Sequence, residues 1–282
     1  MKHILSIVFA VLFGFQLSAQ VITTSAKQVY LGDKMVTIKV ISKEGHNLVY
    51  AHVHENETAA LEAGINMIEK YGGKLVTLEH STGSAKSRNI TFKLNGTEYA
   101  IDPNRIYTPN EQVLASNIKI VKGKGKVDAQ VIGAVKNLAN QVWDEIKYKD
   151  IIIAIHNNKN MPAEYKRKWL FWTHFEPESF SIKSYIKSHD QSSDSNQSCS
   201  DIYINPAINN SEFYIVTQRP DFELLVRNKY TVVLQNTNPV DDGSMSVYAA
   251  RYQKRYFNAE AKMGRVKEQK EMLEILLNSL FD

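Results

Sequence analysis

The chemistry that this sequence can support is most evident where an apolar run gives way to a helical pattern. The apolar run 48–53 is followed by His-Glu-Asn-Glu at positions 54 to 57, and the helical pattern begins at Thr58. An imidazole and a carboxylate in the spacing H-x-x-E can bind one metal ion together when the chain turns between them. The sequence therefore predicts that His54 and Glu57 supply two of the three protein ligands of a catalytic zinc ion.

The third ligand is predicted to come from a second strand end. His156 directly follows the run Ile151–Ile155, which is apolar at every position and is therefore typical of a central strand buried on both faces. Sites in open α/β sheets form at the carboxyl ends of the strands, where His54 also lies. We therefore expect His54 and His156 to meet there.

The same segment also contains a second candidate metal-binding pair. His52 and Glu55 also have the spacing H-x-x-E, and His52 lies on the same strand face as His54. In that register His52 is the metal ligand. In the other register His52 is a hydrogen-bonded histidine of the core.

The elements that must position these residues follow an α/β pattern. From Met35 onward, short β-branched runs alternate with helical patterns, which predicts a mostly parallel mixed central sheet flanked by helices. Strands are expected at 35–41, 48–53, 74–79, 89–94, 97–101, 150–155, 213–217 and 231–235, and helices at 58–71, 128–147, after Pro220 and at 265–280. Asn95-Gly96 predicts a two-residue hairpin turn. After residue 155 the chain is expected to be irregular, and segment 189–200 to be an exposed loop with a free Cys199.

Composition and charge exclude several classes of protein. The 282 residues are 43% hydrophobic and 23% charged, which is typical of a globular protein. The net charge of +4 is spread along the chain without a polybasic block, so no nucleic-acid partner is predicted. A single cysteine excludes a disulfide framework.

The first 19 residues are predicted to be a signal peptide. Lys2 precedes the apolar run 4–15, and small residues at 18–19 offer a cleavage site. The run is shorter than the roughly 20 residues that cross a bilayer, and no later segment predicts a membrane span. We therefore expect a secreted or periplasmic protein whose residues 20–282 form one catalytic domain.

Four motifs in chain order carry a family resemblance. His54-Glu-Asn-Glu57 is similar to an H-G-N-E motif, Asp102-Pro-Asn-Arg105 to a D-x-N-R motif, and Ile155-His-Asn157 to a third-ligand segment. Glu260 comes after Gly243-Ser244, and this order is similar to that of a Gly-Ser pair and the catalytic glutamate in the same family. In this order, over roughly residues 35 to 265, the motifs resemble the zinc carboxypeptidase family and its aspartoacylase and succinylglutamate desuccinylase relatives.

The resemblance implies a zinc carboxypeptidase-like fold and a role for each matching residue. His54, Glu57 and His156 are implied to bind Zn²⁺, and Glu260 to activate a water molecule as the general base. Asp102 is implied to orient a ligand histidine from behind.

Three residues are implied to contact the substrate. Asn104 and Arg105 would bind a substrate carboxylate, for which the guanidinium group is suited, and Arg88 would stabilise the oxyanion. One family feature is missing, because residues 237–240 contain no tyrosine before the Gly-Ser pair, and Tyr248 comes after it.

The expected function is that of a secreted zinc-dependent hydrolase that cleaves an amide bond next to a free carboxylate. The substrate is a small peptide or an acylated amino acid, as for a metallocarboxypeptidase or an acyl-amino-acid deacylase. The alternatives are a catalytically inactive protein that binds a carboxylate or peptide on the same fold, and a structural protein.

Overall fold

The computed structural model describes residues 21–158, 164–169, 172–177, 182–190 and 198–281. The predicted signal peptide at 1–19 lies outside these residues. No helix within the described ranges has the length and apolar character needed to cross a membrane.

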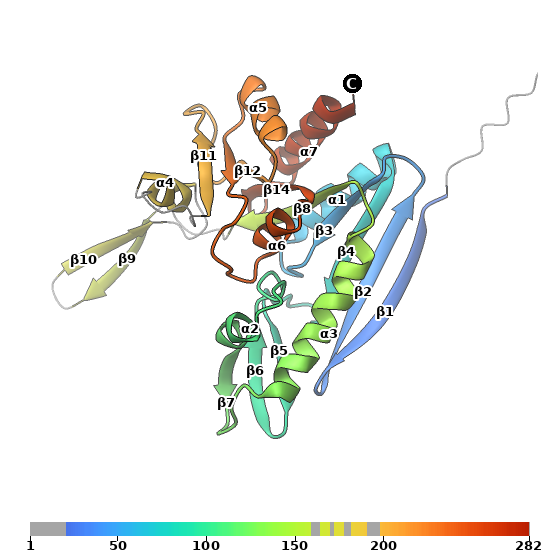
Figure 1. Cartoon of the computed structure of the whole chain (residues 1–282), viewed down its shortest axis with the longest axis vertical. Coiled ribbons are helices and arrows are strands. Elements are labelled where there is room, and N and C mark those ends of the chain that lie inside the picture. The colour runs from blue at the N-terminus through green and yellow to red at the C-terminus, as the bar shows by residue number, and fades with distance from the viewer. Residues whose placement is uncertain (1–20, 159–163, 170–171, 178–181, 191–197, 282) are drawn as a thin grey trace, which may run out of the picture.

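A nine-stranded sheet forms the centre of the molecule (Figure 1). Its strands lie in the order β1 (Thr23–Leu31), β2 (Lys34–Lys43), β4 (Gly73–Glu79), β3 (Leu48–His52), β8 (Ile151–Asn158), β14 (Arg255–Lys262), β12 (Phe213–Val216), β13 (Val232–Gln235) and β11 (Cys199–Tyr203). Strands β4, β3, β8 and β14 are parallel neighbours at the centre, and β12 is parallel to β13. The other four neighbouring pairs are antiparallel. The predicted α/β class with a mixed sheet is confirmed, and the parallel pairing is concentrated around the predicted site.

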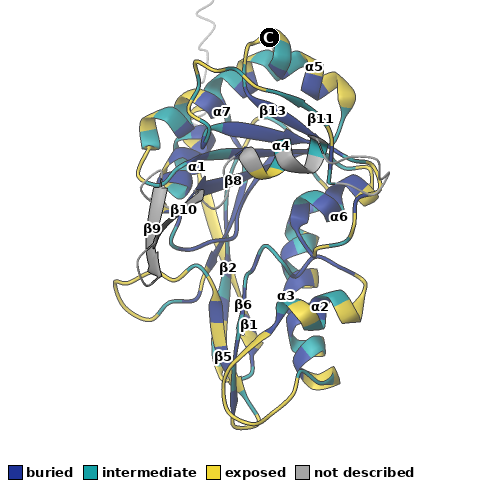
Figure 2. Cartoon of the chain, turned by 90° about the vertical axis from the view of Figure 1, so that its left-hand side faces the viewer, coloured by how far each residue is buried: buried dark blue, intermediate teal, exposed yellow. Residues whose placement is uncertain are grey.

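Helices cover both faces of this sheet. On one face lie α3 (Ala129–Ile146) and α6 (Met245–Arg251), and on the other lie α1 (Thr58–Tyr71), α5 (Arg219–Arg227) and α7 (Val266–Phe281). The short helix α2 (Glu111–Asn117) packs beside α3. The small sheet β5 (Ile90–Leu94), β6 (Thr97–Ile101) and β7 (Lys119–Lys122) packs on the α3 side. Burial is greatest in the central strands, while the distal hairpin ends are exposed (Figure 2).

The central strand β8 shows how the sequence builds two cores at once. Ile152 and Ala154 pack into the core under α3, whereas Ile151, Ile153 and Ile155 pack into the core under α1 and α7. Successive strand residues point to opposite faces, so an entirely apolar run serves both cores. The prediction of a central buried strand is confirmed.

Local signals explain the elements that position the site. The helix α1 has the predicted bounds and ends at Gly72, whose φ of 72° is in the left-handed region. Asp128 accepts hydrogen bonds from two backbone N–H groups at the start of α3. Asn95 and Gly96 both have positive φ and join β5 to β6 as the sequence predicts.

Two expectations about the later part of the chain are wrong. Much of the described chain beyond residue 155 is regular, because β8 continues to Asn158 and the later described segments include the pair β9 (Glu164–Trp169) and β10 (Trp172–Pro177) and the helix α4 (Lys183–Asp190). The predicted loop 189–200 begins within α4 and ends within β11, and its residues 191–197 lie outside the described ranges. Cys199 is buried at the start of β11 rather than exposed, and burial raises the pKa of its thiol to about 11.

Candidate metal centre

The predicted ligands meet at the carboxyl ends of two parallel strands. His54 and Glu57 lie in the connection from β3 to α1, where the Glu57 backbone N–H donates to the His54 carbonyl oxygen at 2.9 Å. This turn directs both side chains to the same side as His156 on the neighbouring strand β8. One ligand atom from each of the three residues lies within 4.8 Å of the others.

The donor atoms are arranged as a small, buried cluster. His54 Nδ1 and His156 Nδ1 lie 2.9 Å and 3.0 Å from the two carboxylate oxygens of Glu57, and 3.1 Å from each other. All three residues are buried. Two imidazole nitrogens and a carboxylate are a ligand set that zinc prefers, so these residues fit a three-ligand zinc site.

Asp102 contacts this cluster from behind, as predicted for a residue that orients a ligand. Its Oδ1 lies 2.7 Å from His54 Nε2 and also accepts a hydrogen bond from the Asn104 backbone N–H at 2.8 Å. Because Nε2 is engaged by Asp102, His54 presents Nδ1 to the cluster.

The charged side chains of the cluster stabilise one another. Burial lowers the pKa of His54, but the charge of Glu57 and the hydrogen bonds to Asp102 and Glu57 outweigh burial and raise this pKa to about 9. Burial raises the pKa of Glu57, yet the two histidines hold it well below its usual range. The pKa of Asp102 is also lowered, because the His54 contacts outweigh burial. Both carboxylates therefore stay ionised beside the histidines, and a metal ion bound here would replace the proton of His54.

The side chains of the alternative pair, His52 and Glu55, have separate partners and do not form a metal site together. The two ring nitrogens of His52 lie 2.8 Å from Thr77 Oγ1 and 3.0 Å from the main-chain oxygen of Glu57, and burial lowers its pKa to about 4. Glu55 instead accepts from Lys86 Nζ at 2.8 Å. His52 is thus a hydrogen-bonded histidine of the core.

Glu260 lies on the strand next to His156. The parallel register of β14 and β8 pairs Glu260 directly with His156, and both side chains point to the sheet face that carries α6. Asn258 Nδ2 donates to Glu260 Oε1 at 3.1 Å. Burial raises the pKa of Glu260, although His156 acts in the opposite direction. A carboxylate with a raised pKa beside a metal centre is suited to accept a proton from water.

Arg88 reaches the centre from the segment before β5. Its NH1 is ion-paired with Glu57 Oε1, and its Nε lies 3.5 Å from Asp102 Oδ2. The guanidinium group lines the same pocket as Glu260. The predicted role in stabilising an oxyanion stays a prediction, and the contacts add that Arg88 holds both carboxylates of the centre.

Asn104 and Arg105 follow β6 and line the same pocket. Asn104 Oδ1 accepts from the Met245 backbone N–H at 3.3 Å, at the start of α6. Arg105 NH1 is ion-paired with Asp242 Oδ2. Asp242 was not among the site residues predicted from the sequence. The guanidinium group expected to bind a substrate carboxylate thus already has an acidic partner from the chain.

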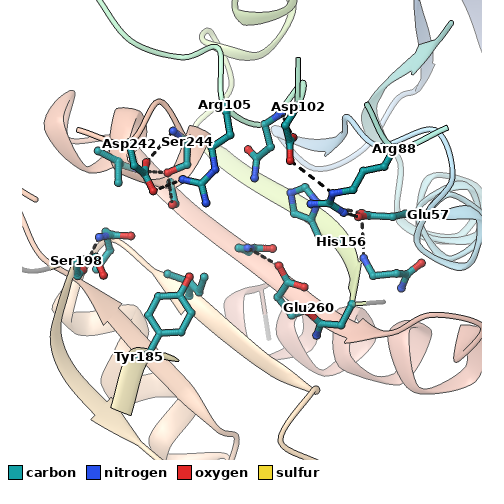
Figure 3. A pocket seen from close by; sticks show the side chains of 18 residues that line it. Glu57, Arg88, Asp102, Arg105, His156, Tyr185, Ser198, Asp242, Ser244 and Glu260 are labelled. Atoms are coloured by element: carbon teal, nitrogen blue, oxygen red, sulfur yellow. Dashed lines mark hydrogen bonds and ion pairs between the residues drawn. The ribbon is translucent and has the colours of Figure 1, made fainter. Parts of the chain in front are cut away.

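Two groups of side chains lie on opposite sides of the pocket in Figure 3: Arg105, Asp242 and Ser244 on one side, and Glu57, Arg88 and His156 on the other. The lining also includes polar residues that sequence reasoning missed: Asn157, Asn158, Tyr185, Ser198, Gln235, Asp242, Ser246 and Asn258. Asn157, Asn158 and Asp242 adjoin recognised motifs, and that proximity is the only signal that could have found them. Tyr185 on α4 had no such neighbour.

The aromatic residue nearest to the Gly-Ser pair takes no part in this pocket. The Tyr248 ring packs edge-on against Trp143 at 4.9 Å and lies 6.4 Å from the Tyr107 ring. These rings line a separate cavity. This agrees with the expectation that Tyr248 does not replace the missing tyrosine.

Comparisons with known proteins give only weak likeness to solved structures. No protein-family model and no curated protein sequence matches the chain. The solved structure of bovine thrombin-activatable fibrinolysis inhibitor in complex with tick carboxypeptidase inhibitor aligns with a TM-score of 0.34 and 10% identity, over 90% of this chain and 88% of that chain. A likeness at this level does not assign the chain to a family.

Proposed function

We propose that the protein is a secreted zinc-dependent hydrolase that cleaves an amide bond next to a free carboxylate. The observation that supports this most is the convergence of His54, Glu57 and His156 at one edge of the sheet, with Glu260 on the adjacent strand. The substrate class is a small peptide or an acylated amino acid.

Each residue of the centre has a defined task in this proposal. His54, Glu57 and His156 would hold the ion, and Asp102 would fix the orientation of His54 through its contact with Nε2. Zinc, when bound there, supplies a Lewis acid that polarises a carbonyl group and makes water more acidic.

The proton and the substrate are handled by other side chains. Glu260 accepts the proton of the attacking water at its carboxylate and passes it to the leaving nitrogen, so that its raised pKa suits both steps. Arg88 stabilises negative charge that develops on the carbonyl oxygen. Asn104 and Arg105, across the pocket, orient the free carboxylate of the substrate.

Metal analysis and one substitution test the proposal together. The purified chain, incubated with zinc and dialysed, is expected to retain about one zinc ion per molecule, as a three-ligand site does. In Glu260→Gln, zinc and ligand binding persist while kcat falls by about 10² to 10⁴-fold, the usual contribution of a general base. The control Glu268→Gln alters a surface residue paired with Arg265 and leaves kcat unchanged.

The outcomes separate the alternatives. A wild-type chain that retains no zinc would contradict the proposed function. A chain that retains zinc and binds N-acylated amino acids without turnover would instead support the inactive binding protein. Normal turnover by Glu260→Gln would remove this residue from the mechanism.

A further inference from the structure

The pairing of Arg105 with Asp242 changes what the pocket offers to a ligand. Both side chains line the pocket and are partly exposed, 35% for Arg105 and 46% for Asp242. One guanidinium nitrogen, NH1, contacts Asp242 Oδ2. A carboxylate of the chain therefore occupies the position next to Arg105 that a ligand carboxylate would take.

The loop that carries Asp242 is held in place by contacts on both sides. Asp242 Oδ1 accepts a hydrogen bond from the Ser244 backbone N–H at 2.9 Å, which leaves Asp242 Oδ2 for Arg105. Asn117 Nδ2 donates to the main-chain oxygens of Arg105 and Asp242 at 3.0 Å and 3.1 Å. The acidic partner is thus built into the rim of the pocket.

Gly243 makes this close approach possible. Its φ is 77°, and a Cβ atom there would lie 2.6 Å from the Arg105 carbonyl oxygen. The Tyr107 backbone N–H also donates to the Gly243 carbonyl oxygen at 2.8 Å. A larger residue would push the loop away from the Arg105 segment, so the glycine is needed to seat Asp242 beside Arg105.

We propose that Asp242 is a specificity-determining residue that neutralises Arg105 in the free pocket, so that a ligand carboxylate binds Arg105 only by displacing Asp242. The inference deepens the proposed function and rests on it. Exposed ion pairs are weak and can exchange partners. A carboxylate that replaces Asp242 gains one ion pair but loses another, so its affinity depends on additional contacts, such as Asn104.

The neighbouring aspartate provides a matched comparison. Asp241 accepts from Arg251 NH1 at 3.0 Å and from Thr108 Oγ1 at 2.6 Å, and it does not line the pocket that holds the metal centre. It also accepts from the Gly243 backbone N–H at 3.0 Å. Asp241 and Asp242 thus share a loop and a charge, but Asp242 is ion-paired with Arg105 and Asp241 with Arg251.

The test measures ligand affinity by calorimetry for the zinc-loaded full-length chain carrying Glu260→Gln, in which ligand binding persists while turnover is lost, with N-benzoylglycine and its carboxamide as probes. Asp242→Asn retains an Oδ1 atom for the Ser244 N–H but removes the charge. We expect N-benzoylglycine to bind about five-fold more tightly, the upper range for one exposed ion pair, and the carboxamide to bind as before. Asp241→Asn is expected to change neither affinity. In the Arg105→Ala background, Asp242→Asn should have no further effect.

Several results would overturn the inference. An unchanged or weaker affinity for N-benzoylglycine in Asp242→Asn would do so, and so would an equal gain for both probes. If Asp242→Asn does not fold, Asp242→Ala should show the same selective gain.

The proposed function fails separately. Carboxylate binding without turnover in the wild type would contradict the hydrolase activity and leave the role of Asp242 standing. No binding of N-benzoylglycine by either wild type or Asp242→Asn would overturn both proposals.

Discussion

Two polar clusters face each other across one pocket and differ in how they are held. The candidate metal centre is buried, and its histidine and glutamate side chains lie at or just after the ends of central strands. The Arg105–Asp242 pair lies on loops and is partly exposed. A buried charge must be matched by fixed partners, whereas an exposed ion pair contributes little and can open. The first cluster therefore suits chemistry that requires fixed geometry, and the second suits selection among ligands.

The largest effect is expected from removing a buried ligand. His156→Ala should reduce the zinc content from about one ion per chain to almost none, because two remaining ligands do not hold a catalytic zinc. His54→Ala should behave in the same way. Metal content after dialysis measures both.

His52→Ala is the matched control, because His52 is equally buried but contacts Thr77 instead of the cluster. It should retain zinc. If His52→Ala lost zinc and His54→Ala retained it, His52 rather than His54 would be the metal ligand.

An intermediate effect is expected from the residue behind the centre. Asp102→Asn weakens the hold on His54 Nε2 without removing a ligand, so zinc affinity should fall by about 10- to 100-fold. Competition with a chelator of known affinity measures this change. Asp144→Asn, which alters an exposed aspartate paired with Lys147, should leave zinc affinity unchanged.

The smallest effect is expected at the exposed pair. Arg105→Ala should keep full zinc content but lower kcat/KM for carboxylate substrates by about ten-fold, since hydrogen bonds to charged groups are lost. The amidated substrate should be affected much less. Arg251→Ala, which removes the partner of Asp241, serves as the control. Equal losses on both substrates would remove Arg105 from carboxylate recognition.

Much of the fold could be predicted because the central elements have regular hydrophobic patterns. The apolar residues that recur along the predicted helix 128–147 are buried in α3: Val131, Val135, Leu138, Val142 and Ile146. The strand β1 was not predicted, because most of its side chains are exposed and it lacks an apolar alternation. The short helix α6 also escaped prediction, since seven residues give little periodicity.

The residues of the candidate site also differ in how far the sequence could predict them. His54, Glu57 and His156 follow predicted strands, so the rule that sites form at strand ends brought them together. Asp242 and Tyr185 come from a loop and a short helix, and the only local signal for either is that Asp242 precedes Gly243-Ser244. The contact of Asp242 with Arg105 joins residues 137 positions apart, which no local pattern reveals.

The order of the central strands has a consequence for how the chain reaches its native state. His54 and His156 are separated by 102 residues, and Glu260 joins them only when β14 pairs with β8. Contacts between residues so far apart in sequence form late in folding. The chain must lose the conformational entropy of closing a long segment before these contacts can stabilise it. An ion that binds this centre acts on the native state alone and slows the return to the unfolded chain. Zinc uptake during refolding should therefore appear only after the helices have formed, as a signal that the last central strand has been added.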